Sequence, residues 1–334
     1  MNRRDFVAEA LVGGALLGPI RGGMAQQGAT ARELPESARS PEVVIEGRAS
    51  GQPHSGKVLA AIQPHADDIP LFAGGTVAKL INEGYTGYLI RTSNDDKTGG
   101  GTVGEAIASN ERDNDAVAKA LGLKKAFNLW YPNHQLDSAP REAMRERLIF
   151  LIRLLKIDTI ICYDPWGTYE ENPDHYVTAQ VAESACWMAG MGRDYPEHLA
   201  AGMQPHGVLE KYYFARGPQL VNRVVDITPW TDQKVEANLV NTTQGPGGQS
   251  GAHLRARLAG QKLRLPILGS DDDTANRQYI KHILLDYDSE YLRGVPSDKE
   301  IGRKYGLERA EAFHYIGPKQ SMLDRYISEH SVPL

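Results

Sequence analysis

The chain has few cysteines, no long apolar run and no excess of positive charge. Cys162 and Cys186 are the only cysteines among 334 residues, which excludes a disulfide scaffold, and both lie in apolar patterns typical of buried free thiols. No block of like charges suggests a tail or a membrane-surface patch. The formal net charge of −5 argues against a nucleic-acid-binding protein that contacts phosphates. With 41% hydrophobic and 24% charged residues, the composition is that of a globular protein with a sizeable core.

The first 25 residues have the pattern of an export signal. Arg3 and Arg4 precede a short apolar stretch that ends in small residues near Ala25. This stretch is too short and interrupted to span a membrane, and the paired arginines are typical of a twin-arginine signal peptide. We therefore expect a periplasmic or secreted protein without a membrane span; the alternative is a frayed N-terminal helix. The polar residues 26–55 are predicted to be a linker or N-terminal arm.

From residue 56 onward, short apolar runs alternate with helical patterns. This alternation predicts a single α/β domain over residues 56–334, Rossmann-like, with a mainly parallel sheet and helices on both faces. The Gly-rich and then charged stretch at about 244–275 is predicted to be a loop insertion over one face. Predicted strands are 57–65, 86–93, 125–132, 158–165, 208–215 and 222–228, and predicted helices are 74–84, 104–122, 139–157, 173–190 and 229–244.

Two polar clusters follow predicted strands, where ligands bind in such sheets. His65, Asp67 and Asp68 come directly after the first strand, and such groups are costly to bury unless they are paired or hold a metal. His65 and Asp68 are three residues apart and can converge on one cation, for which zinc accepts both donor types. A catalytic zinc site needs a third ligand, and His175, beside Asp174 after the fourth strand, is the best candidate. Taken alone, the first cluster is equally well explained as a structural or solvated turn.

These clusters resemble the two signature segments of the PIG-L (LmbE-like) family of zinc-dependent de-N-acetylases. The family pattern Pro-His-Pro-Asp-Asp-Glu reads here Pro-His-Ala-Asp-Asp-Ile at 64–69, and His-Pro-Asp-His reads Asn-Pro-Asp-His at 172–175. The resemblance spans about residues 57–317. It implies a zinc ion, or another divalent cation, held by His65, Asp68 and His175. It also implies that Asp67 is the general base.

The chain departs from the family pattern at two positions. Ile69 replaces the glutamate after the aspartate pair, and Asn172 replaces the first histidine of the second segment. The amide of Asn172 can donate a hydrogen bond but cannot transfer a proton at neutral pH. We therefore expect Asn172 to take part in catalysis by stabilising the oxyanion, with weaker acid assistance.

Three further residues are candidates for substrate binding. Arg112 resembles the family's substrate-facing arginine, although an exposed helix arginine is the competing interpretation. Asp96 could bind sugar hydroxyls or be a solvated turn residue. Asp174 could orient the site or stabilise a helix start through the dipole.

The function expected from these observations is that of an exported, zinc-dependent amidohydrolase. It would use metal-activated water to remove an N-acetyl group from an amino sugar in a glycan, glycoside or glycolipid. One alternative is an amidase that acts on another N-acyl substrate, such as a thiol conjugate. A second alternative is a non-catalytic carbohydrate-binding protein on the same fold, which the departures at Ile69 and Asn172 would favour.

Overall fold

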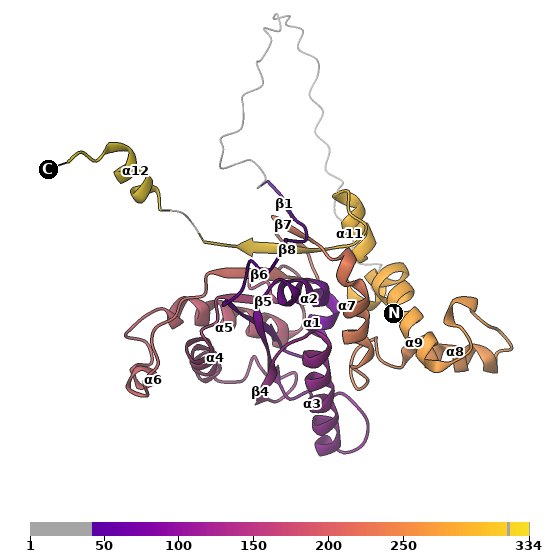
Figure 1. Cartoon of the computed structure of the whole chain (residues 1–334). Coiled ribbons are helices and arrows are strands. Elements are labelled where there is room, and N and C mark those ends of the chain that lie inside the picture. Colours follow the sequence, from indigo (N-terminus) through magenta and orange to yellow (C-terminus); the bar gives the residue numbers. More distant parts are fainter. Residues whose placement is uncertain (1–41, 319–320, 334) are drawn as a thin grey trace, which may run out of the picture. The chain divides into compact units, whose positions relative to one another are not determined.

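Strands and helices alternate along the chain as the apolar pattern predicts (Figure 1). The structure, a computed structural model, describes residues 42–318 and 321–333, and the predicted signal peptide lies outside them. The described strands form one sheet of eight, in the order β1-β7-β8-β6-β5-β2-β3-β4. They are β1 (Val44–Glu46), β2 (Val58–Gln63), β3 (Thr86–Ser93), β4 (Lys125–Tyr131), β5 (Thr159–Tyr163), β6 (Glu210–Phe214), β7 (Arg223–Asp226) and β8 (Ala310–Ile316).

The sheet is mostly parallel, which confirms the predicted α/β class. Only β8 runs against its neighbours, since it pairs antiparallel with both β6 and β7, whereas the pairs within β4-β3-β2-β5-β6 and the β1–β7 pair are parallel. Parallel strands place their carboxyl ends at one edge of the sheet, and loops at that edge are the usual ligand sites in such folds.

Helices cover both faces of the sheet because the buried strands are apolar on both sides. Along β2, Leu59 and Ala61 belong to one core cluster, whereas Ala60 and Ile62 belong to the other. The first cluster includes side chains of α1 (Asp68–Phe72), α2 (Gly74–Asn82), α3 (Val103–Ala120) and α7 (Thr231–Leu239). The second includes side chains of α4 (Arg141–Leu155) and α5 (Pro173–Ala189). The free thiols Cys162 and Cys186 are buried in this second cluster, as predicted.

Six further helices complete the described part of the chain, and none of the described helices is long and apolar enough to cross a membrane. They are α6 (Pro196–Ala200), α8 (Ser250–Gly260), α9 (Asp272–Tyr279), α10 (Ser289–Arg293), α11 (Asp298–Lys304) and α12 (Met322–His330). A π-helical segment at Ile280–Tyr287 follows α9. Single 3-10 turns lie at Thr228–Trp230, before α7, and at Pro266–Leu268, between α8 and α9.

The structure contains several elements that the sequence pattern did not predict, among them β8. Residues 42–55 were expected to be part of a linker, yet they contain β1, an edge strand of the sheet. Glu46 at its end accepts hydrogen bonds from Lys79, Tyr212 and Arg223. A strand of three residues has too little apolar periodicity to be recognised. Residues 250–279 are largely helical, in α8 and α9, rather than an irregular loop. The acidic residues that were expected to lie in this loop begin α9, and Asp271 caps the helix by accepting a hydrogen bond from Thr274 N.

Candidate metal centre and its cavity

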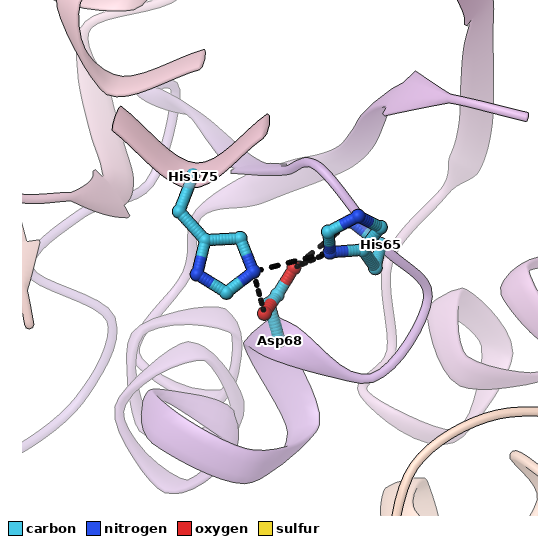
Figure 2. Close-up of side chains that lie close together, drawn as sticks. All are labelled: His65, Asp68 and His175. Atoms are coloured by element: carbon cyan, nitrogen blue, oxygen red, sulfur yellow. Dashed lines mark hydrogen bonds and ion pairs between the residues drawn. The ribbon is translucent and has the colours of Figure 1, made fainter. Parts of the chain in front are cut away.

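Three candidate ligands lie together at the carboxyl end of the sheet (Figure 2). His65 follows β2, and Asp68 begins α1 three residues later. His175 lies in the first turn of α5, after β5. Because β2 and β5 are paired neighbours, the loops that follow them meet, although 110 residues separate the two histidines.

The three side chains present their donor atoms to one point. His65 Nδ1 lies 3.2 Å from His175 Nε2 and 3.4 Å from Asp68 Oδ2, and His175 Nε2 lies 3.6 Å from Asp68 Oδ1. One donor atom from each residue falls within 4.8 Å of the others, and all three residues are buried. Two imidazole nitrogens and one carboxylate match the protein ligands of a catalytic zinc site.

The position of His65 is set by acceptors on the far side of its ring. His65 Nε2 lies 3.1 Å from Asn133 Oδ1 and 3.2 Å from Asp174 Oδ2. Since both partners are acceptors, Nε2 carries the hydrogen and Nδ1 presents its lone pair to the cation site. A carboxylate behind a ligating histidine fixes the ring and raises its basicity. The fully buried Asp174 also accepts from the backbone N–H groups of His134 and Leu136.

His175 and Asp68 have comparable partners. His175 Nδ1 lies 3.2 Å from Glu170 Oε1, and Arg216 Nε donates to Glu170 at 3.0 Å. Although burial alone would raise it, His175 and Arg216 lower the pKa of Glu170 to about 2. Tyr163 donates to Asp68 Oδ1 at 2.8 Å, and its ring stacks on His175. Each candidate ligand is therefore oriented before a cation binds.

Asp67 lies beside these ligands on the wall of a cavity of about 430 Å³. Burial and the neighbouring Asp68 carboxylate raise the pKa of Asp67 to about 7. Gln244 Nε2 donates to Asp67 Oδ1 at 3.2 Å. Gly245 packs so closely that a Cβ there would lie 2.5 Å from Asp67 Oδ2. The segment after α7 thus holds the carboxylate that lies next to the candidate ligands without belonging to them.

The structure also locates the two positions at which the chain departs from the family pattern. Asn172 lines the same cavity, and its Nδ2 lies 3.2 Å from His175 Nε2, while its Oδ1 caps α5. Ile69, the other departure from the family pattern, is fully buried in the core beside α2 and does not line the cavity. The replacement of a carboxylate at that position therefore leaves the ligand set complete.

The three predicted substrate-binding residues do not line the cavity. Asp174 is fully buried and contacts His65 rather than the cavity, which agrees with the orienting role that the sequence also allowed. Asp96 accepts from Asn133 N at 2.9 Å and so supports the turn behind the histidine. Arg112 is exposed on α3 and donates to Ser109. A helix surface carries charges at many positions, so the sequence could not show which of them faces the cavity.

Several cavity residues were missed by sequence reasoning. Arg216 follows β6, Gln244 follows α7 and Tyr291 lies on α10, all far along the chain from the two motifs. Tyr291 and Tyr169 line the cavity and are 85% and 90% exposed, so their rings stand at its opening. Tyr169 also has a left-handed backbone with φ of 62°, and such residues cluster at ligand-binding sites. No spacing rule connects these positions, and of the three missed residues only Arg216 directly follows a strand.

Comparisons with known proteins show that the chain is similar to de-N-acetylases. The family model described as PIG-L: GlcNAc-PI de-N-acetylase matches residues 60–186, a span that includes all three candidate ligands. A diacetylchitobiose deacetylase of Thermococcus kodakarensis is 30% identical over 194 residues, which cover 57% of this chain and 71% of the relative.

Solved structures share the fold. The N,N'-diacetylchitobiose deacetylase of Pyrococcus horikoshii aligns with a TM-score of 0.59 at 23% identity, covering 78% of this chain and 84% of that one. The 4-carboxy-2-hydroxymuconate hydratase of Pseudomonas putida aligns with a TM-score of 0.53 at 17% identity, covering 79% and 98%. Because a hydratase has this architecture too, the fold alone does not define the reaction.

Proposed function

The chain belongs to the PIG-L family of de-N-acetylases, and from that premise we propose that it is a metal-dependent hydrolase that removes the N-acetyl group of an amino sugar. One observation carries the proposal. Two imidazoles and a carboxylate converge within 4.8 Å, and the free carboxylate of Asp67 shares their cavity. A metal-dependent hydrolase needs this combination of a ligand set and a separate base.

The donor set fits a divalent cation, and zinc is the cation we propose. His65, Asp68 and His175 would hold it through Nδ1, a carboxylate oxygen and Nε2. A zinc ion there would supply Lewis acidity to a water molecule and to the amide carbonyl. The partners Asp174, Glu170 and Tyr163 already orient the three ligands, which supports a metal function rather than a structural turn.

The remaining chemistry belongs to this chain's own side chains. Asp67, held by Gln244, would take a proton from the attacking water and return it to the leaving amine nitrogen. Asn172 would donate through Nδ2 to the developing oxyanion, because that amide lies on the ligand side of His175. Asn172 cannot deliver a proton, so Asp67 would serve as both base and acid.

Acetate release and metal content test this proposal together. Purified protein should bind about one zinc and release acetate from N-acetylglucosamine derivatives. Asp67→Asn should keep the metal and lose about 10²- to 10⁴-fold in kcat. The matched control is Asp115→Asn, which removes the same charge from an exposed position on α3. Full activity of Asp67→Asn, or activity unchanged after metal removal, would show the mechanism to be wrong. A panel that includes N-acyl thiol conjugates would reveal an amidase of different specificity.

We also propose that the protein is exported, on the pattern of residues 1–25 alone. Replacement of Arg3 and Arg4 by lysine should stop export, as measured by cell fractionation, and should leave the in vitro activity unchanged. Normal export of the double variant would rule out the twin-arginine route.

A further inference from the structure

A second and larger cavity adjoins the catalytic one. Its volume is about 670 Å³, and it lies between the segment that follows β6 and the segment that contains α10 and α11. Phe72, Arg216 and Arg293 line both cavities. The two cavities are therefore neighbours that share part of their walls. Each has the size of a small-molecule site.

The buried charges that line the second cavity are already paired within the protein. Asp298 lies 3.0 Å from Arg293 and 2.9 Å from Lys234. Glu311 lies 2.8 Å from Lys234 and accepts from the backbone N–H groups of Gly75 and Thr76. A carboxylate that is neutralised in this way has little affinity left for a charged guest. These buried charges therefore build the wall, whereas Glu290, Glu300 and Lys304, which also line the cavity, are exposed to solvent.

The surface that remains for a guest is mainly apolar. Phe72 and Phe214 form part of the wall on the sheet side. Val221 comes from the segment between β6 and β7, whereas Val295 and Ile301 come from the opposite side, before and within α11. An apolar group that leaves water for such a cavity gains binding free energy in proportion to its buried area.

Arg216 stands at the boundary between the two cavities. Its guanidinium is fixed by Glu170, the partner of His175, and its side chain is still 31% exposed. The N–H groups of a fixed guanidinium suit the oxygens of a sugar ring. In an N-acetylglucosamine glycoside, the aglycone is attached to the carbon next to the one that bears the reacting amide. An aglycone therefore starts close to the catalytic cavity, and with the ring at Arg216, which lines both cavities, it can extend into the second cavity.

We propose that the second cavity binds an apolar aglycone of the amino-sugar substrate. The proposal rests on the proposed function for the identity of the sugar. It makes the natural substrate a glycoside or glycolipid with an apolar group next to the sugar, rather than a free N-acetylated monosaccharide.

The experiment compares methyl, butyl and hexyl glycosides of N-acetylglucosamine in acetate release. It also measures calorimetric binding of the corresponding glucosaminides, the deacetylated products, which requires no turnover. The hexyl compound should exceed the methyl compound by at least about tenfold in kcat/KM and in affinity. Val221→Trp and Ile301→Trp fill the cavity from opposite walls and should abolish this advantage while leaving the methyl glycoside unaffected. Leu263→Trp, an exposed position outside the cavity, is the matched control and should change neither.

Equal values for the methyl and hexyl compounds in both assays would overturn the proposal. So would a hexyl advantage that survives in both cavity-filling variants when thermal unfolding shows them folded. A chain-length effect confined to longer N-acyl groups on a methyl glycoside would overturn it as well, because the chain would then be the acyl group. If no glycoside releases acetate but the hexyl product binds more tightly and both variants remove that gain, the proposed function fails and the cavity assignment stands.

Discussion

Asp174→Asn tests whether the carboxylate behind His65 prepares the metal site. Asp174 is fully buried and accepts from His65 Nε2 at 3.2 Å, from His134 N at 2.7 Å and from Leu136 N at 3.2 Å. An amide of the same shape keeps one acceptor oxygen and turns an NH₂ group toward donors. Hydrogen bonds to a charged group contribute about 1.5–3 kcal/mol each, against about 1 kcal/mol for neutral ones. The variant should therefore unfold with about 2–4 kcal/mol less free energy.

Asp174→Asn should also weaken metal binding, which is the effect that separates a positioning role from a purely structural one. Loss of the carboxylate behind a ligating histidine lowers metal affinity about 10- to 100-fold. Competition with a chromophoric chelator measures that affinity, and guanidinium unfolding of the metal-free protein measures stability. The control is Asp324→Asn, an exposed carboxylate in the first turn of α12, which shares the helix-start position but touches no candidate ligand. If Asp174→Asn keeps its zinc affinity within about twofold and loses only the ~0.3–1 kcal/mol of a helix-dipole contact, then Asp174 does not position His65.

Three other variants test separate features of the site and its support. Arg216→Ala should lower kcat/KM at least about tenfold, because it frees Glu170, the partner of the candidate ligand His175. Arg112→Ala should leave kcat/KM within about twofold, since that side chain is exposed. Equal losses would contradict the placement of both arginines. Gly245→Ala should cost about 1–2 kcal/mol of stability for its left-handed backbone and should lower kcat strongly, since its Cβ would lie 2.5 Å from Asp67 Oδ2; unchanged kinetics would show that Asp67 can move freely. Although burial alone would raise the pKa of Asp298, the side chains of Arg293 and Lys234 hold it below its ordinary value. The ionised carboxylate therefore stabilises the fold above about pH 4, and this stabilisation is lost as the pH falls further. Asp298→Asn should therefore cost about 3 kcal/mol at pH 7 and much less near pH 3 in guanidinium titrations, and a pH-independent cost would contradict the ion pairing.

Much of the fold was readable from local pattern. The strands that became β2, β3, β4 and β5 were predicted within about two residues, because long alternations of apolar strands and amphipathic helices dominate the parallel core. β1 was missed, since three residues at a sheet edge carry too little periodicity. The helices α8 and α9 were also missed. The glycines at the start of the 244–275 stretch and the aspartates around the start of α9 are typical of loops, and the sequence did not show that Asp271 caps a helix.

The candidate ligands were readable because the chemistry is concentrated in two short segments at strand ends. His65, Asp68 and His175 lie together in the structure because β2 and β5 are adjacent. The substrate-binding residues were not readable in this way. Arg112 and Asp96 matched a pattern but lie outside the cavity, while Arg216 and Tyr291 line it without belonging to either motif.

The sequence by itself predicted the α/β class, the candidate ligands and the neighbouring carboxylate, because each of these depends on residue types within short segments at strand ends. Only the tertiary structure showed the contact of Asp174 with His65, the hydrogen bond of Gln244 to Asp67, and the second cavity beside Arg216. The physical reason is distance along the chain. Hydrogen bonds such as that of Gln244 with Asp67 join residues 177 apart, and cavity walls are assembled from loops whose meeting is settled by how the strands pair and the helices pack.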